Sequence, residues 1–203
     1  MILETLITTN NETGDRHIAA MGPRFEGSDF AKEGLQKMVL RPYPETRTLK
    51  NLLTMGVGVV HITDNVFNIV RAALNREKSK EDKEFNRQLA ETIEQTCCRY
   101  ASFRVIHSNV ESMPPQLYCQ LNHWTRNRDF IGFNRAKNAI IEMAILVTRV
   151  RFLPKSEIDE AIVKSKIIVD KTGAEQEMQS YEFLIDYLND YYQNETGQAD
   201  LPD

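Results

Sequence analysis

The sequence has few cysteines, and none of their spacings points to a structural role. The three cysteines are Cys97, Cys98 and Cys119. Adjacent cysteines rarely pair with each other, three cannot complete a disulfide framework, and no CxxC pair marks a zinc site. We therefore expect free, inert thiols in a reducing compartment, which is the cytoplasm.

A strong charge of either sign and a long apolar run are both absent. The net charge is −4 and the pI is about 5.7, so no global field favours nucleic acid or an anionic membrane. The longest apolar candidate, AIIEMAILV at residues 139–147, is far shorter than the run of about 18 residues that crosses a bilayer. The first ten residues lack the features of a signal peptide. We expect a soluble protein without nucleic-acid or membrane partners.

Motifs for several kinds of chemistry are also missing. No GxGxxG follows a strand pattern, and no GxSxG suggests a nucleophilic hydrolase. The histidines form no i, i+4 pair on an expected helix and no triad with a carboxylate, so we expect no metal site. Nothing marks Cys119 as an activated nucleophile. The four histidines are His17, His61, His107 and His123.

The sequence does contain strand patterns, and they dominate its first two thirds. The chain of 203 residues, 41% apolar and 27% charged, suits one generous domain or a domain with an appended subdomain. Turn residues and prolines separate the strands, and the pattern predicts two hairpins. The expected strands are residues 5–9, 16–27, 37–43, 56–64, 98–107 and 116–125.

Helical periodicity is concentrated in the last third. A short helix is expected from Thr46 to Met55, a second at residues 66–74, and a long helix from about Asn134. Two more are expected at residues 154–173 and 174–192, followed by a frayed tail.

The charged run at residues 75–88 is interpreted as an exposed loop or a solvated helix face, with a lid as the alternative. Together the patterns predict a mainly β fold with helices: a β-barrel of about six strands plus a C-terminal helical layer. Residues 1–130 would form the barrel, and residues 131–203 a helical region packed on it.

One polar stretch, RPYPETRTLKNL at residues 41–52, could hold an anion. Thr46 or Thr48 sits where a helix N-cap belongs, and a helix start offers unpaired N–H groups and partial positive charge. Arg47 adds a planar fork for phosphate oxygens, and Asn51 lies one turn further on. A capped helix with surface arginines explains the same residues, so both interpretations are open.

A second constellation is GFNRAKNAIIE at residues 132–142. Asn134 is an expected N-cap, and Arg135 and Lys137 place cations in the first helical turn, where they oppose the macrodipole. Either these cations pair with Glu142 and other acids, or they compensate with a bound anion. Arg126 and Arg128, just upstream, add weight to the anion.

Several segments together resemble the flavin-reductase-like FMN-binding split-barrel superfamily. ETLITTNNETGDRHIAAMGPR resembles its opening hairpin, and RPYPETRTLKNL followed by VVHITDNV resembles its phosphate-binding turn, helix and next strand. RDFIGFNRAKNAIIEMAILVTRV, with a later helix ending in DKTG, resembles the C-terminal part of one uncharacterised prokaryotic branch, a domain of unknown function. The resemblance covers nearly the whole chain.

The resemblance implies a homodimer that binds FMN near the subunit interface. The phosphate would be met by Thr46, Arg47, Thr48 and Asn51, with Arg41 as a weaker candidate. Ala20, Met21 and Gly22 would lie close to the isoalloxazine ring. Asn134 and Arg135 match the motif of the branch, without an assigned role. The branch is also associated with one-carbon metabolism that uses tetrahydromethanopterin.

Three functional hypotheses follow. The first is an FMN-dependent oxidoreductase acting on a small molecule, because FMN carries the redox chemistry while the protein positions it. The second is a flavin-binding carrier or sensor without turnover. The third is a ligand-free scaffold, suggested by the charged run at residues 75–88 and by a tyrosine-rich last helix.

Overall fold

The computed structural model describes residues 1–26, 35–74 and 80–198. They group into two compact units. Met1–Asp64 and Arg71–Ile131 belong to the first, which we call the barrel unit, while Asn65–Val70 and the chain from Gly132 belong to the second, the helical unit. Each unit is described by itself below.

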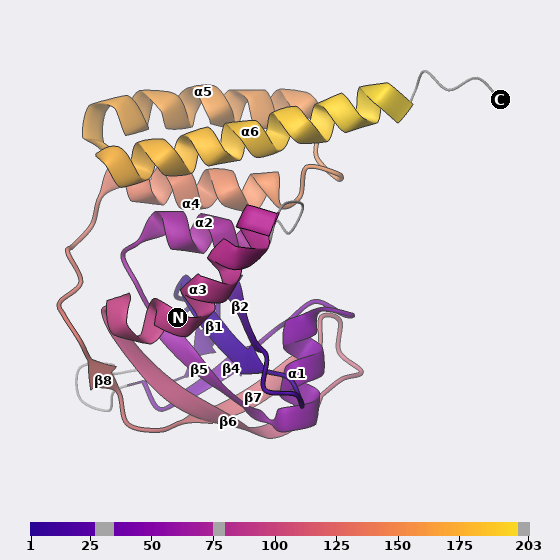
Figure 1. Ribbon diagram of the computed structural model, residues 1–203, viewed down its shortest axis with the longest axis vertical. Coiled ribbons are helices and arrows are strands. Elements are labelled where there is room, and N and C mark those ends of the chain that lie inside the picture. Colours follow the sequence, from indigo (N-terminus) through magenta and orange to yellow (C-terminus); the bar gives the residue numbers. More distant parts are fainter. Residues whose placement is uncertain (27–34, 75–79, 199–203) are drawn as a thin grey trace. The chain divides into compact units, whose positions relative to one another are not determined.

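The barrel unit is built on one antiparallel sheet, with eight strands in the described residues (Figure 1). Along the sheet the order is β2-β1-β5-β6-β7-β4-β3, and β8 pairs with β6. The strands are β1 (Thr5–Asn10), β2 (Arg16–Met21), β3 (Arg24–Phe25), β4 (Lys37–Leu40), β5 (Val57–Ile62), β6 (Arg99–Asn109), β7 (Gln116–Leu121) and β8 (Thr125–Arg126).

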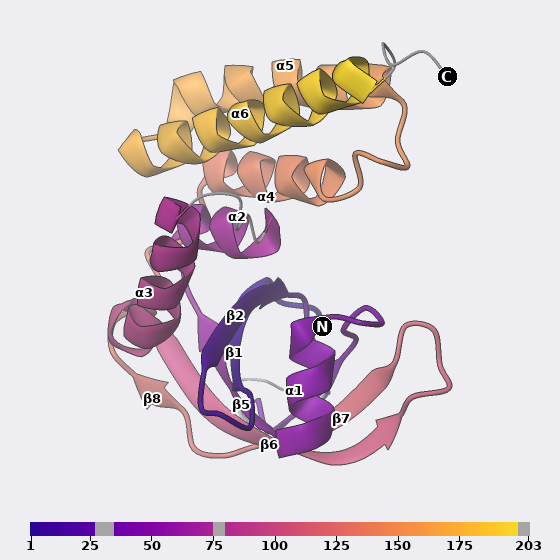
Figure 2. The same ribbon diagram turned by 45° about the vertical axis from the view of Figure 1, so that its right-hand side comes forward.

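The two outermost strands of this sheet are neighbours in the sequence. Only Gly22 and Pro23 separate β2 from β3, so the sheet has to curl until its edges approach each other (Figure 2). Extended residues before β1 complete the closure, because Ile2 forms an antiparallel bridge with Arg24. Closing a sheet in this way removes free edges, which are otherwise prone to pair with other chains.

Apolar side chains fill the interior of the curled sheet, and one face of helix α1 (Arg47–Met55) packs against them. The helix contributes Leu49 and Leu52 to a core cluster that includes Phe25 and Phe103. Its other face, with Lys50 and Leu53, is exposed. The helix ends at Gly56, whose φ of 68° lies in the left-handed region that glycine adopts without strain. The helix at residues 46–55 is therefore confirmed, with Thr46 as its N-cap.

Helices α2 (Val66–Leu74) and α3 (Lys80–Thr96) follow β5. Asn65 caps α2 by accepting a hydrogen bond of 3.0 Å from the N–H of Asn68. Residues 75–79 of the charged run lie outside the described residues, but an exposed loop is wrong for the remainder, which begins α3. This helix buries a face with Leu89 and Ile93, and it includes a buried carboxylate, Asp82.

Arg71 explains how Asp82 is tolerated inside. The guanidinium of Arg71 lies 3.1 Å from Asp82 and over the ring of Phe85, at 4.3 Å from its centroid. A charged residue that looks solvated in the sequence is thus buried with a partner on another helix.

The helical unit consists of α4 (Arg135–Val147), α5 (Lys155–Thr172) and α6 (Glu175–Gln198), together with the first residues of α2. The three long helices pack side by side (Figures 1 and 2). The rings of Phe67 and Phe183 meet edge to face at 6.1 Å. The fully buried side chains of the three helices include Ile140, Met143, Ile158 and Leu184.

Several element boundaries differ from the sequence expectation. The strand expected at 116–125 divides into β7 and β8, whereas the break in the strand at 16–27 lies at Gly22–Pro23, where the glycine and proline indicate it. Strand β4 already ends at Leu40, before Pro42. The last helix continues to Gln198, well into the tail that was expected to fray. Among the described helices, none combines the length and apolar character that a membrane span requires.

Candidate flavin site

The start of α1 is shaped as the sequence predicts, with Thr46 as a bonded N-cap. The Thr46 hydroxyl donates to the carbonyl of Tyr43 at 2.8 Å and accepts from the N–H of Leu49 at 3.3 Å. The hydroxyl therefore both donates and accepts a hydrogen bond within the protein. The other N–H groups of the first turn have no acceptor within the helix, so they and the Arg47 guanidinium are the donors suited to an anion.

Arg47 lies near the turn between β1 and β2. Hydrogen bonds from Asn11 and Thr13, and then the positive charge of Arg47, lower the pKa of the Asp15 carboxyl. Burial, and then the charge of Arg47, lower the pKa of His17 to about 4, so this imidazole is neutral at pH 7. His17 therefore carries no positive charge that would add to that of Arg47.

Thr48 and Asn51 point away from solvent. Thr48 is 3% exposed and Asn51 is 4% exposed. The Asn51 amide donates to the Thr9 hydroxyl at 3.0 Å, which ties α1 to β1. Asn51 thus holds α1 against β1, while Arg47 is exposed at the start of the helix.

Residues 20–22 form the end of β2 and the turn into β3. The Thr5 hydroxyl donates to the carbonyl of Met21 at 2.9 Å, which fixes the end of the strand. A Cβ placed on Gly22 would lie 3.0 Å from the side chain of Ile2 and 3.4 Å from that of Glu4. The lack of a side chain at Gly22 thus lets the chain pass close beside the residues that precede β1.

Arg41 follows β4 and is exposed. It lines a hollow of about 440 Å³ that also includes Arg24, a residue that the sequence analysis did not select. Arg24 comes two residues after Gly22, at an outward position of β3. Arg24 lies two residues beyond residues 20–22, which are expected beside the isoalloxazine ring, and this closeness in the sequence could have identified it.

Asn134 and Arg135 belong to the helical unit, whereas the other predicted site residues belong to the barrel unit. Asn134 caps α4: its oxygen accepts from the N–H of Lys137 at 3.1 Å, and its amide donates to the Thr172 carbonyl at 2.9 Å. Arg135 is exposed and has no hydrogen bond or ion pair with any residue in the described ranges. The structure therefore gives Asn134 a helix-capping role.

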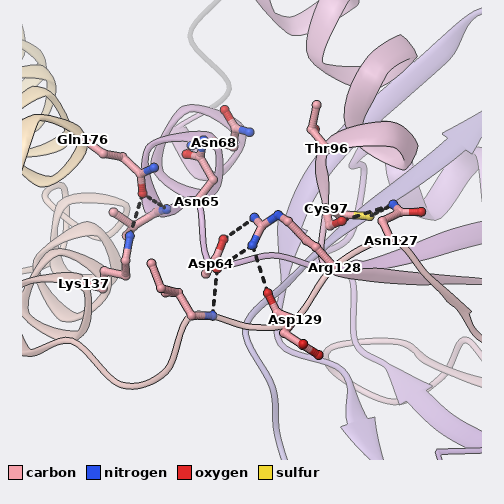
Figure 3. A network of polar contacts seen from close by, with 12 residues as sticks. Asp64, Asn65, Asn68, Thr96, Cys97, Asn127, Arg128, Asp129, Lys137 and Gln176 are labelled. Carbon is pink, nitrogen blue, oxygen red and sulfur yellow. Dashed lines mark hydrogen bonds and ion pairs between the residues drawn. The ribbon is translucent and has the colours of Figure 1, made fainter.

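Two arginines that precede these residues in the sequence are paired within the barrel unit. The guanidinium of Arg128 binds both carboxylate oxygens of Asp64 (Figure 3), and one of those oxygens also accepts from the N–H of Ile131 at 3.1 Å. These hydrogen bonds, with that of Arg128 as the main cause, lower the pKa of Asp64 to about 2. Arg126 pairs with Asp129.

Lys137 is paired within the helical unit. Its ammonium donates to Glu177 at 2.6 Å. It also donates to Gln176 at 2.8 Å (Figure 3). The sequence suggested Glu142, five residues further along α4, as a partner, but the observed carboxylate is Glu177 of α6. The ion-pair interpretation accounts for Arg126, Arg128 and Lys137 without a bound anion.

The histidine and cysteine side chains of the barrel core are not reactive. His61 is fully buried, its Nε2 lies 3.0 Å from the Thr8 hydroxyl, and burial lowers its pKa to about 3. Burial raises the pKa of Cys97 to about 11 and that of Cys119 to about 12, so both are thiols at pH 7. Within the described residues, no three His, Cys, Asp or Glu side chains gather as a metal site would require.

Two family models match this chain by sequence. The N-terminal domain of a protein of unknown function, DUF447, matches residues 3–128, and the second DUF447 model matches residues 134–186. No curated protein matches the chain by sequence.

Solved structures are similar over most of the chain. An FMN-bound protein of the same family model from Methanosarcina mazei is 16% identical, with a TM-score of 0.66 over 92% of this chain and 94% of that one. A flavoredoxin of Desulfovibrio vulgaris is 11% identical, with a TM-score of 0.44 over 62% and 69% of the two chains. An FMN-binding protein from Thermus thermophilus is 8% identical, with a TM-score of 0.47 over 62% and 70%. The expected split barrel with a C-terminal helical region is confirmed.

Proposed function

This chain belongs to the DUF447 family of proteins of unknown function, and we propose that it is a flavoprotein that binds FMN on its split barrel. The observation that carries the proposal is the FMN-bound Methanosarcina mazei protein of the same family, which matches almost the full length of both chains. The start of α1 supports it, because a helix start with an adjacent arginine suits a phosphate group.

The proposed contacts divide between the phosphate and the ring. The Arg47 guanidinium and the backbone N–H groups of Arg47 and Thr48 would bind the phosphate, Thr46 would cap that turn, and Asn51 would hold it in place through its bond to Thr9. Residues 20–22 would lie beside the isoalloxazine ring. The hydrogen-bond donors at the start of α1 suit a phosphate group. The Thr46 hydroxyl already makes two hydrogen bonds within the protein, so Arg47 and the backbone N–H groups would bind the phosphate. Arg41 stays a further candidate, and Asn134 and Arg135 are assigned no contact with FMN.

The proposal extends to catalysis and assembly. FMN supplies electron transfer when bound, so the activity is that of an oxidoreductase acting on a small molecule. We place the protein in the cytoplasm, as a homodimer with the flavin near the subunit interface, and the three unbridged cysteines fit that compartment. A link to one-carbon metabolism that uses tetrahydromethanopterin belongs to the same proposal. Residues 1–130 would carry the flavin and residues 131–203 would form the helical domain.

Flavin titration tests the binding. Stripped protein should bind FMN with a shifted flavin absorbance spectrum and a raised melting temperature. Riboflavin, which lacks the phosphate, should bind at least tenfold more weakly, because charge-assisted hydrogen bonds contribute about 1.5–3 kcal/mol each. Protein that stays colourless at saturating FMN, with no thermal shift, would show that the proposal is wrong.

Arg47→Ala tests the phosphate position. It should weaken FMN about tenfold and leave riboflavin unchanged, because riboflavin has no phosphate for Arg47 to bind. Arg99→Ala is the matched control, since Arg99 is an exposed arginine at the start of β6 with no partner among the described residues. Equal FMN affinity in both variants would place the phosphate away from α1.

Turnover is a separate measurement. FMN-loaded protein is mixed anaerobically with NADH or NADPH. The absorbance of oxidised flavin is then followed near its maximum, at about 450 nm. Bleaching supports the oxidoreductase. Persistent flavin absorbance with each reductant would instead favour the carrier or sensor.

A further inference from the structure

A hollow of about 440 Å³ lies on the outer face of the sheet, where β3, β4 and β7 run side by side. Arg24 pairs across the ladder with Val39, and Val39 pairs with Tyr118, so these three side chains stand next to each other on one face. Residues of the opposite parity, such as Leu40 and Leu117, are fully buried in the barrel core. The hollow is therefore a feature of the outer surface, with a volume in the range of small-molecule sites.

Two arginines line this hollow without a partner among the described residues. Arg24 enters from β3 and Arg41 from the end of β4. Neither side chain forms an ion pair or hydrogen bond with a residue in the part of the chain that the structure describes. In the same part of the molecule, Arg16 binds Glu94 and Arg128 binds Asp64, so pairing is common where an acid is near.

The acidic side chain that lines the hollow does not neutralise both arginines. Glu26 is exposed, and its carboxylate is not within ion-pairing distance of a described cation. Among the described residues of the lining, the three charged side chains therefore sum to one positive charge. Two like charges that converge on one concave surface repel each other, and an anion placed between them removes that repulsion.

The remaining wall is polar and aromatic. Tyr118 donates its hydroxyl to the side-chain oxygen of Gln116 at 3.2 Å, which fixes both side chains along β7 and orients the Gln116 amide as a donor. The Tyr118 ring also packs beside His107, at 5.4 Å between ring centroids. A flat ring and fixed donors beside two guanidinium forks suit a group with several negatively charged oxygens.

We propose that this hollow is an oxyanion site, in which Arg24 and Arg41 bind a phosphate or carboxylate group from opposite sides. Two sources supply that chemistry. One is the phosphate of FMN itself, in which case the inference rests on the proposed flavin binding and places the phosphate here rather than at the start of α1. The other is the acidic group of a second small molecule that meets the flavin.

The first experiment measures oxyanion binding without flavin. Inorganic pyrophosphate is titrated calorimetrically into stripped protein at low salt. Arg24→Ala with Arg41→Ala should weaken binding at least tenfold, and Glu26→Gln should strengthen it because a repelling carboxylate is removed. Arg99→Ala, which removes a charge outside the hollow, should leave the affinity unchanged. The far-ultraviolet circular dichroism spectrum checks that each variant is folded.

The second experiment identifies the source. FMN and riboflavin affinities are compared in the same variants. If the double variant loses the preference for FMN over riboflavin, the oxyanion is the flavin phosphate. If the preference is kept while pyrophosphate binding is lost, the hollow serves a second ligand.

The inference is overturned if the double variant, still folded, keeps wild-type affinity for pyrophosphate and the wild-type preference for FMN. Its failure is distinguishable from that of the proposed function. A wild-type protein that binds pyrophosphate through Arg24 and Arg41 but binds no flavin would retain the oxyanion site and lose the flavoprotein assignment.

Discussion

Replacing Lys137 by methionine should destabilise the helical unit by about 3 kcal/mol. The ammonium of Lys137 lies 2.6 Å from Glu177 and 2.8 Å from Gln176, and the side chains of Lys137 and Glu177 are only 16% and 4% exposed. Methionine keeps most of the length and apolar surface of lysine. The substitution therefore removes the charge and leaves the Glu177 carboxylate buried without its cation.

The size of this destabilisation depends on the hydrogen bond that Glu177 keeps when Lys137 is replaced. Breaking a buried ion pair on one side costs about 3–5 kcal/mol. The second carboxylate oxygen still accepts a hydrogen bond of 2.8 Å from the N–H of Ala174, so part of the charge stays satisfied and the lower end applies. Burial alone would raise the pKa of Glu177, but the bonds from Lys137 and Ala174 outweigh it and the pKa is lowered. Without Lys137 the pKa of this carboxyl should rise.

Urea denaturation followed by circular dichroism measures the effect. With an m-value of about 2 kcal/mol per molar, 3 kcal/mol shifts the midpoint by about 1.5 M. Lys155→Met is the control, because its pair with Asp159 is 62% and 51% exposed and should contribute less than about 1 kcal/mol. Glu177→Leu combined with Lys137→Met should recover much of the loss, since no buried charge remains. Equal midpoints for the Lys137→Met and Lys155→Met proteins would refute the reasoning.

Three other predictions concern the barrel unit. The pKa of Asp64 is lowered to about 2, so its pair with Arg128 stabilises the fold above the unfolded pKa of about 3.9 and is lost as the pH falls through 2. Asp64→Asn should lower the free energy of unfolding by about 1–2 kcal/mol at pH 7. It should also make the urea midpoint depend less on pH between pH 5 and pH 2, because the carboxyl that titrates there is gone. Gly58→Ala should cost about 1–3 kcal/mol by thermal denaturation, because its Cβ would lie 2.6 Å from the Phe103 ring and 2.9 Å from the Thr8 carbonyl; an unchanged melting temperature would contradict this. The pKa of His61 is about 3, so its imidazole NMR signals should not titrate between pH 8 and pH 5.

Local signals in the sequence identified much of the fold. Thr46, Asn65 and Asn134 are short polar residues just before apolar helical patterns, and each caps a helix in the structure. Gly56 ends α1 because the left-handed conformation there favours glycine. The information needed for these features lies within a few residues, which is why a single sequence reveals them.

Features that depend on distant residues were not accessible in the same way. The partner of Lys137 is Glu177, 40 positions along the chain, and no local pattern selects it over Glu142. The buried Asp82 of α3 is stabilised by Arg71 of α2, so its helix face looks solvated when read alone. The oxyanion hollow likewise depends on strand register, which brings Arg24, Val39 and Tyr118 together from three strands.

Within the helical unit, a segment from the middle of the chain completes a bundle that is otherwise C-terminal. Residues 65–70 group with the helices that begin after Gly132, and the N–H of Val66 donates to Gln176 at 3.0 Å. A fragment that starts at residue 132 would lack this segment, leaving Gln176 without one donor and Phe183 without the ring of Phe67. During synthesis, residues 65–70 leave the ribosome long before the helices they join. The bundle can therefore complete only after the chain that forms β6 and β7 has been made, which couples the order of folding to the order of the sequence.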